Sequence, residues 1–245
     1  MNADWKLEPA HDLGMPVGAR ARSLKRESGL IDTFGHWAWG LTTRSYFRLW
    51  HGLEVHGREH LPVEPPFVLV GNHCSHLDAL ALAAPLPLSL RDRVFPLAAG
   101  DVFFEREATA LFASSLLNAL PIWRRRSTPK ALAELRERLL GEPCGFILFP
   151  EGGRSRDGNL LPFKPGLGML VAGTTVPVVP CHLTGALAAL PPGRRVPLRK
   201  KLVLRIGPAL RFGAEPDARA GWEAVAASAE AAVQALAAAG GVTPG

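Results

Sequence analysis

The chain has 245 residues, of which 47% are hydrophobic and 20% charged, and its formal net charge is +6. This length suits one α/β domain with a terminal extension and allows a full hydrophobic core. The three cysteines, Cys74, Cys144 and Cys181, have neither paired nor metal-type spacing, which argues against a disulfide framework and fits a reducing compartment.

Positive charge is concentrated in three runs, at residues 20–26, 124–126 and 194–201. Such runs attract phosphate groups on lipids, on coenzyme A or on nucleic acid, although a solvated surface is the alternative. The arginines are not interleaved with exposed aromatic residues and no DNA-binding motif is present, so we expect no nucleic-acid partner.

The first 28 residues are polar, and we expect them to be loosely ordered. Residues 31–53 have helical periodicity. On one side of this helix we expect Trp39, Thr43, Tyr46, Phe47, Trp50 and Leu53, and on the other Arg44, Arg48 and His51. This pattern is typical of an amphipathic helix at the lipid headgroup boundary, and a helix that covers the protein's own core is the alternative. We therefore predict an N-terminal extension (1–52), a catalytic domain (53–240) and a disordered tail (241–245).

Short apolar runs then alternate with helical segments, which predicts an α/β fold. We predict strands at residues 53–55, 67–70, 94–99, 120–123, 146–149, 176–182 and 202–206. We predict helices at residues 78–84, 107–118, 129–140 and 222–236. Residues 165–192 are almost free of charge, but Pro177 and Pro180 break any helix there. We therefore expect a protein that rests on a membrane and does not cross it, and we find no signal peptide.

Residues 71–78, Gly-Asn-His-Cys-Ser-His-Leu-Asp, place polar chemistry at the end of a predicted buried strand. Three interpretations are open. Ser75 and Asp78 have the spacing of a helix capping box. His73, Cys74, His76 and Asp78 are possible metal ligands, but Cys74 and Ala79 stand where the common metallohydrolase pattern has histidines, so we predict no metal. Finally, His73 can act as a general base whose ring is oriented by Asp78, a role compatible with a cap.

A second polar stretch follows the strand predicted at residues 146–149 and reads Pro150-Glu151-Gly152-Gly153-Arg154. Paired glycines let main-chain N–H groups approach an anion, and Arg154 adds positive charge. The sequence therefore predicts a phosphate site here, with a glycine-rich surface turn as the alternative.

In this order and separation, the two stretches resemble the glycerolipid acyltransferase family, whose prototype is 1-acylglycerol-3-phosphate acyltransferase. The first block of the family is matched by Asn72, His73 and Asp78, and the third by residues 149–155, except that Gly153 replaces a threonine. Ile122-Trp123-Arg124 resembles the second block, in which an arginine contacts the acceptor's phosphate, and Arg125 is a rival for that role. Residues 176–180 resemble the fourth block, whose apolar side chains are expected to line an acyl groove.

The resemblance implies a mixed, largely parallel central sheet flanked by helices. It also implies transfer of an acyl group from acyl-CoA or acyl carrier protein to a hydroxyl of a lysophospholipid such as 1-acylglycerol-3-phosphate. His73 and Asp78 would be catalytic, and Arg124, Glu151, Gly152, Gly153 and Arg154 would bind substrate, with no cofactor beyond the thioester co-substrate. We expect a cytoplasmic enzyme, peripheral on the inner face of the cell membrane. The alternatives are a thioesterase that uses the same His/Asp pair, a basic membrane-binding protein without activity, and an acyl-enzyme formed on Cys74 or Ser75.

Overall fold

The computed structural model describes residues 14–24, 26, 30–100, 104–122 and 129–241. The helices and strands follow one another as α1 (Val17–Ala21), α2 (Leu30–Leu49), β1 (Glu54–His56), η1 (Arg58–His60), β2 (Phe67–Gly71), α3 (Asp78–Ala83), η2 (Leu88–Leu90), β3 (Val94–Ala99), α5 (Glu107–Ser115), β4 (Leu120–Ile122), α6 (Pro129–Gly141), β5 (Gly145–Leu148), α7 (Gly166–Val171), β6 (Val178–Thr184), α8 (Ala186–Ala189), β7 (Val203–Ile206) and α9 (Arg219–Gly241). Each strand and helix predicted from the sequence is present, with ends that differ by a few residues.

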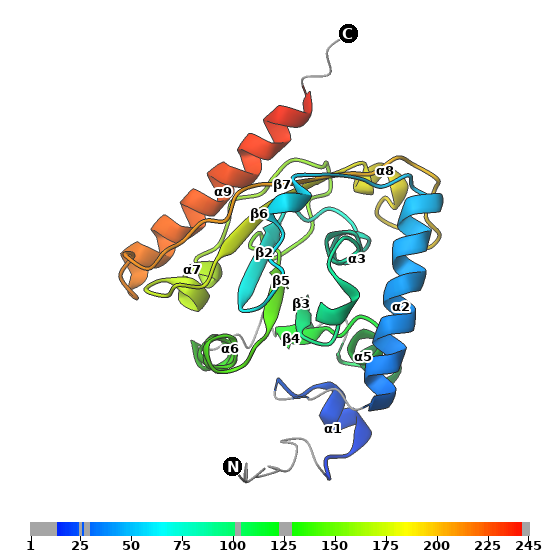
Figure 1. Cartoon of the computed structure of the whole chain (residues 1–245), viewed down its shortest axis with the longest axis horizontal. Coiled ribbons are helices and arrows are strands. Elements are labelled where there is room, and N and C mark those ends of the chain that lie inside the picture. Colours follow the sequence, from blue (N-terminus) through cyan, green and yellow to red (C-terminus); the bar gives the residue numbers. More distant parts are fainter. Residues whose placement is uncertain (1–13, 25, 27–29, 101–103, 123–128, 242–245) are drawn as a thin grey trace, which may run out of the picture.

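The strands form one seven-stranded sheet in the order β1-β7-β6-β2-β5-β3-β4. All neighbouring strands are parallel except β6 and β7, which are antiparallel. The predicted mixed, largely parallel sheet is therefore confirmed. Helices cover both faces of the sheet, with α2, α3 and α5 on one side and α6, α7 and α9 on the other (Figure 1).

The buried strands supply both hydrophobic cores by alternation, because successive side chains of a strand point to opposite faces. In β2, Phe67 and Leu69 belong to the core under α3, whereas Val68 and Val70 belong to the core under α6, α7 and α9. All four side chains are fully buried. This explains why the strand reads as an uninterrupted apolar run.

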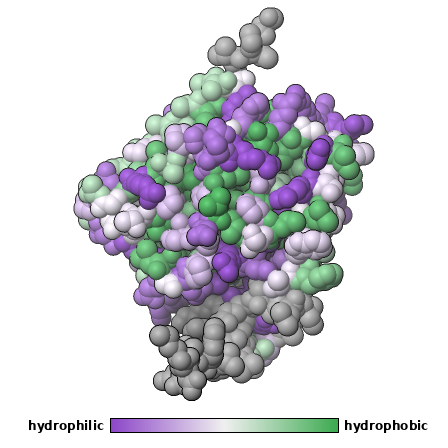
Figure 2. All heavy atoms as spheres, in the orientation of Figure 1, coloured by the Kyte–Doolittle hydropathy of each residue, from purple (hydrophilic) through white to green (hydrophobic). Residues whose placement is uncertain are grey.

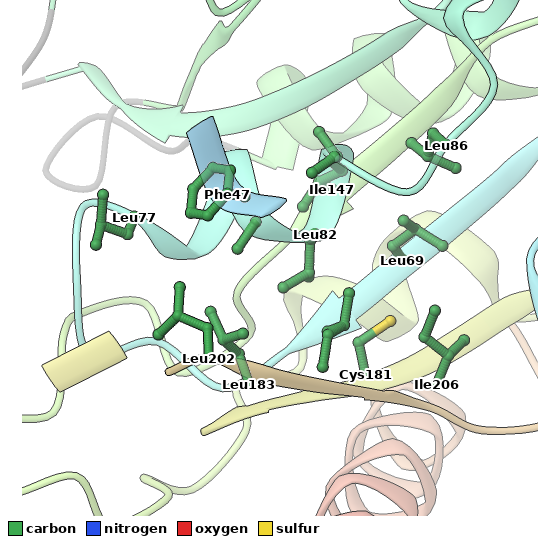
Figure 3. Close-up of a cluster of buried hydrophobic side chains, with 14 of the residues drawn as sticks. Phe47, Leu69, Leu77, Leu82, Leu86, Ile147, Cys181, Leu183, Leu202 and Ile206 are labelled. Carbon is green, nitrogen blue, oxygen red and sulfur yellow. The ribbon is translucent and has the colours of Figure 1, made fainter. Parts of the chain in front are cut away.

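Helix α2 packs against the first of these cores. Phe47 is fully buried and lies in the same cluster as Leu69 and Leu82 (Figure 3). The N-terminal segment thus contributes side chains to the core of the α/β domain. The division of the chain at residue 52 stays a prediction.

The predicted division of α2 into an apolar and a basic side is wrong in part. Phe34, Trp37 and Leu41, which follow one another at helical spacing, are 70%, 47% and 44% exposed. By contrast, His51, predicted on the basic side, is buried and lies within hydrogen-bond distance of Lys200 O (2.9 Å). The physical reason is that α2 ends at Leu49, so that His51 no longer follows the helical period. Hydrophobic and hydrophilic residues are interspersed on the face of the molecule that Figure 2 shows.

The first basic run serves the fold. The Arg22 guanidinium donates to Phe104 O (2.7 Å), and that of Arg26 donates to Asn118 Oδ1 (2.9 Å) and Ala119 O (3.2 Å). These two arginines hold the segment after α1 against the chain around α5. The middle run, residues 124–126, lies outside the described residues. Among the helices that the structure describes, none has the length and apolar character needed to cross a bilayer.

Candidate active site

The two polar stretches leave the same edge of the sheet. Strands β2 and β5 are parallel neighbours, with Val70 opposite Leu148, so residues 72–78 and 149–158 emerge side by side from their carboxyl ends. Ligand sites of open α/β sheets lie at this edge. The fold therefore brings together the two blocks that the sequence keeps about 70 residues apart.

A buried carboxylate orients the imidazole of His73. His73 Nδ1 lies 2.8 Å from Asp78 Oδ2, and the Asp78 side chain is fully buried whereas that of His73 is 23% exposed. The same oxygen accepts the main-chain N–H groups of Cys74 (2.7 Å) and Ser75 (2.8 Å). Because Asp78 Oδ2 accepts, Nδ1 carries the proton and Nε2 is left with a free lone pair. The imidazole is also stacked on Phe149, with ring centroids 4.3 Å apart.

The predicted capping box is present only in part. Asp78 accepts the N–H of Ser75 as the motif requires, but Ser75 Oγ accepts the N–H of Leu77 (3.3 Å) instead of that of Asp78. Helix α3 begins at Asp78 with no side-chain cap at Leu77. Asp78 therefore binds the ring of His73 and the main chain of the two residues that follow it, and helix capping is the smaller part of its role.

Glu151 joins the two loops through the main chain of His73. Its Oε1 accepts the His73 N–H (2.6 Å) and its Oε2 accepts the Leu161 N–H (3.0 Å). The Ser155 N–H donates in turn to His73 O (2.8 Å). Burial raises the pKa of the Glu151 carboxyl, and the two main-chain hydrogen bonds oppose that shift. Both carboxylate oxygens are thus occupied by main-chain donors, and the predicted contact of Glu151 with substrate stays a prediction.

Asn72 fixes the other end of the His73 loop. Its side-chain amide donates to Leu183 O (3.0 Å) and accepts the Leu183 N–H (2.8 Å). Asn72 is buried, so this pair extends the contact between β2 and β6 by one residue beyond the last strand pair, Gly71 and Cys181. The Asn-His dipeptide thus combines an anchor with a functional side chain.

The glycine-bearing loop presents cations and free main-chain donors beside His73. Gly152 has φ +69°, a backbone conformation that favours glycine, and a Cβ built on it would lie 2.7 Å from Lys164 Nζ and displace that side chain. Gly153 faces open space. Within the described part of the chain, the N–H groups of Gly153 and Arg154 have no hydrogen-bond partner. Arg154 is exposed. Partial burial, followed by repulsion from Arg154, lowers the pKa of His76.

His73 borders two cavities. The larger, of about 390 Å³, lies between the sheet and helices α6 and α7, and Gly152, Gly153 and Lys164 stand on its wall. Its apolar wall consists of residues such as Leu97, Ile122, Leu132, Leu148, Met169 and Leu170. The smaller, of about 90 Å³, lies beside α3 and α5 and is bordered by both His73 and His36. Phe149 lines both cavities.

Residues 176–180, which the resemblance predicts to line an acyl groove, border neither of the two cavities beside His73. Val176, Val178 and Val179 are buried in and beside β6, between β2 and β7, and none of them borders either cavity. Their apolar character reflects burial between two helical layers. The walls of the larger cavity include residues of β3, α6 and α7. The sequence pattern predicts these residues to be buried, but it does not distinguish a cavity wall from the core. Arg124 lies outside the described residues, although Ile122, two residues before it, lines the larger cavity.

A covalent acyl-enzyme is disfavoured. Cys74 is buried, and burial raises the pKa of its thiol to about 12, with repulsion from Asp78 as a second cause. Ser75 is fully buried. A thiol in that state is a poor nucleophile at neutral pH. The described residues also hold no group of three or more His, Cys, Asp and Glu side chains placed to bind a metal ion.

Comparison with known proteins decides the family. The family model described as Acyltransferase matches residues 52–184, more than half of the chain and both loops of the site. The chain belongs to the acyltransferase family. The resemblance inferred from Asn72, His73 and Asp78 and from residues 149–155 is therefore confirmed.

Several relatives of this acyltransferase-family chain are named 1-acyl-sn-glycerol-3-phosphate acyltransferases. The alpha forms of Mus musculus and Homo sapiens are each 34% identical to it over 130 residues, which cover 52% of this chain and 44% of each relative. The chloroplastic BAT2 of Brassica napus is 33% identical over 151 residues, which cover 57% of this chain and 39% of the relative. This chain thus matches less than half the length of these relatives.

The fold is shared with a solved structure. The 1-acyl-sn-glycerophosphate (LPA) acyltransferase PlsC from Thermotoga maritima superposes with a TM-score of 0.65, covering 87% of this chain and 81% of its own, at 23% sequence identity. The two proteins therefore share their α/β architecture.

Proposed function

We propose that this acyltransferase-family protein moves a fatty acyl group from a thioester, acyl-CoA or acyl carrier protein, to a hydroxyl of a lysophospholipid such as 1-acylglycerol-3-phosphate. The observation that carries the proposal is the position of His73. Its ring is held by buried Asp78 at 2.8 Å and borders both cavities beside a cation-bearing loop. The names of the sequence relatives support the choice of acceptor.

His73 acts as the general base. Its Nε2 takes the proton of the acceptor hydroxyl as that oxygen attacks the thioester carbonyl, and Asp78 stabilises the imidazolium that forms. The carbonyl carbon gains a C–O bond and loses its C–S bond, and the leaving thiolate takes up the proton. A positioned base contributes about 10²–10⁴-fold in rate. The main-chain hydrogen bonds of His73 with Glu151 and Ser155 hold its loop in place, so that its ring stays at the border of the two cavities.

The larger cavity suits a lipid substrate. Its volume of about 390 Å³ and apolar wall fit an acyl chain, and Lys164 and Gly153 border it next to His73. Lys164, Arg154 and the free N–H groups of Gly153 and Arg154 supply donors for a phosphate group at the mouth. We assign Arg124 to the same phosphate because Ile122 leads into this wall. No cofactor is required, since the thioester itself is the activated acyl group.

Exposed apolar residues of α2 suit a peripheral contact with a membrane. Phe34, Trp37 and Leu41 share one side of the helix, and they would insert at the level of the headgroups. Basic side chains lie near the other end of α2, where the Arg199 guanidinium is 6.0 Å from the Trp50 ring. Anionic lipid on the inner face of the cell membrane would attract them.

The test offers a labelled acyl thioester to the purified protein with and without a panel of lysophospholipids. We expect label in a diacyl product that depends on the acceptor, with lysophosphatidic acid among the best. Label recovered only as free fatty acid, at a rate that no acceptor changes, would show a thioesterase. No consumption of thioester under any condition would leave a membrane-binding protein without activity.

A further inference from the structure

Residues 159–164 connect the glycine-bearing loop to α7 and contain neither helix nor strand. Three main-chain N–H groups of this segment donate to residues outside it. They are those of Leu161 to Glu151 Oε2 (3.0 Å), Phe163 to Glu230 Oε2 (2.8 Å) and Lys164 to Pro150 O (2.9 Å). Two of these hydrogen bonds hold the segment to the site loop, and the third holds it to α9.

Glu230 is fixed on α9 in the position that this contact needs. Its Oε1 accepts from the Gln234 side chain one helical turn further on (3.1 Å), and its Oε2 accepts the Phe163 N–H. Helix α9 packs closely on α7, since a Cβ built on Gly168 would overlap Trp222 Cα (Figure 1). The Glu230 carboxylate therefore belongs to a helix that packs against α7, a wall of the larger cavity.

The residue after Phe163 brings a cation to that cavity. Lys164 is exposed and stands with Gly152 on the cavity wall. A Cβ built on Gly152 would lie 2.7 Å from Lys164 Nζ and 3.2 Å from its Cε, so the end of the lysine side chain lies along the Gly152 main chain. In the part of the chain that the structure describes, this ammonium has neither an ion-pair nor a hydrogen-bond partner.

The position of the ammonium depends on the main chain that carries it. Lysine has a flexible four-carbon stem, so a fixed main chain is what brings its charge to one place. Phe163 is buried in the core cluster under α6, α7 and α9, and its N–H is satisfied by Glu230. Leaving that N–H without a partner is costly, so without the carboxylate we expect the segment to move until the N–H reaches water. Such a movement takes Lys164 away from Gly152.

We infer that Glu230 is a positioning residue for the proposed acyl transfer. By accepting the Phe163 N–H, it holds the Lys164 ammonium beside Gly152, where the ammonium binds a phosphate group of a substrate. The inference rests on the proposed function and adds to the site a residue of the C-terminal helix, outside the residues 52–184 that the family model matches. The phosphate belongs to the lysophospholipid acceptor or to coenzyme A, and kinetics separate the two sources.

The test replaces Glu230 and measures the KM of each substrate separately. Glu230→Leu removes the acceptor of the Phe163 N–H, and we expect the KM for lysophosphatidic acid to rise roughly tenfold with kcat little changed, because a hydrogen bond to a charged group contributes at least this much. A rise in the KM for acyl-CoA instead supports the same inference and assigns the phosphate to coenzyme A. If neither KM rises in a folded Glu230→Leu protein, the inference is overturned.

A conservative variant tests the hydrogen bond itself. Glu230→Gln retains a side-chain oxygen that accepts the Phe163 N–H, so its KM should stay near that of the unsubstituted protein. Glu223→Leu, at an exposed position of α9, is the matched control and should also leave the KM unchanged. A Glu230→Gln protein as impaired as Glu230→Leu would contradict the inference. If Glu230→Leu does not fold, Glu230→Asp takes its place, because the shorter side chain withdraws the carboxylate from the Phe163 N–H.

A double-mutant cycle with Lys164→Met separates positioning from general stabilisation. In a protein that already carries Lys164→Met, adding Glu230→Leu should raise the KM no further, because the cation that Glu230 positions is gone. An equal additional rise would show that Glu230 acts without Lys164 and would overturn this inference alone, with acyl transfer intact. If the unsubstituted protein transfers no acyl group, the proposed function fails and this inference fails with it.

Discussion

The main-chain N–H of His73 donates to Glu151 Oε1 at 2.6 Å, and His73 O accepts from the Ser155 N–H at 2.8 Å. Both polar groups of the His73 main chain are therefore held by the neighbouring loop. Glu151 also accepts from the Leu161 N–H, so a single buried carboxylate links the chain on both sides of the site. The glutamate of the third block thus holds the main chain of the histidine that the first block supplies.

This relationship predicts the effect of Glu151→Gln. An amide has one acceptor oxygen, so one of the two buried N–H groups loses its partner, and we expect a loss of about 1–3 kcal/mol in the free energy of unfolding. We also expect kcat to fall at least tenfold, with KM for the acceptor little changed. Denaturant unfolding and steady-state kinetics measure the two effects. Glu137→Gln is the matched control, because Glu137 is exposed on α6. If Glu151→Gln changes only the KM for the acceptor, Glu151 is a substrate ligand and does not position His73.

The two adjacent glycines should respond differently to the same substitution. Gly152→Ala adds a Cβ at φ +69° and within 2.7 Å of Lys164 Nζ, so we expect about 1–2 kcal/mol of destabilisation and a marked loss of activity. Gly153→Ala adds a Cβ in open space and should change stability little. Thermal unfolding of the two variants gives the comparison. Equal losses in both would contradict the geometry described for this loop.

The buried cysteines should resist alkylation. Burial raises the pKa of the Cys74, Cys144 and Cys181 thiols to about 12, so each is protonated below that pH in the folded protein. At pH 8 such a thiol is ionised in about one molecule in 10⁴. Iodoacetamide at pH 8 should therefore leave the native protein's mass and activity unchanged, and modify all three residues after denaturation. Rapid modification of Cys74 with loss of transfer would revive a covalent mechanism.

The exposed apolar side of α2 makes membrane binding testable. We expect Trp37→Ser combined with Leu41→Ser to weaken sedimentation with vesicles of phosphatidylcholine and phosphatidylglycerol by tenfold or more, because both side chains would leave water on binding. Activity on a short-chain, water-soluble acceptor should stay near that of the unsubstituted protein. Val63→Ser is the control, because Val63 is 78% exposed and lies outside α2. Unchanged vesicle binding would assign the contact to another surface.

Local sequence patterns were sufficient to predict most of the helices and strands. Strands β2 and β5 are buried on both faces, and their sequences are therefore uninterrupted apolar runs. Helix α6 is buried on one face, and the spacing of Leu135 and Leu139 marks that face. The orientation of α2 did not follow in the same way. Its aromatic residues occur on both its buried and its exposed sides, so composition alone could not say which side packs on the core.

The site was predictable to the extent that its chemistry is local. His73 and Asp78 are five residues apart, and their pairing follows from spacing within one loop. The contact of Glu151 with the His73 main chain spans 78 residues, and it depends on the adjacency of β2 and β5, which no local pattern encodes. The same holds for His36, which reaches the smaller cavity from a helix that the sequence assigned to an extension.

The most direct test of the account replaces the base itself. His73→Ala, assayed for acyl transfer to lysophosphatidic acid at saturating donor, should lose about 10²–10⁴-fold in kcat while its unfolding midpoint stays close to that of the unsubstituted protein. His56→Ala on β1 should keep full activity. A folded His73→Ala protein that transfers acyl groups at the original rate would contradict the account.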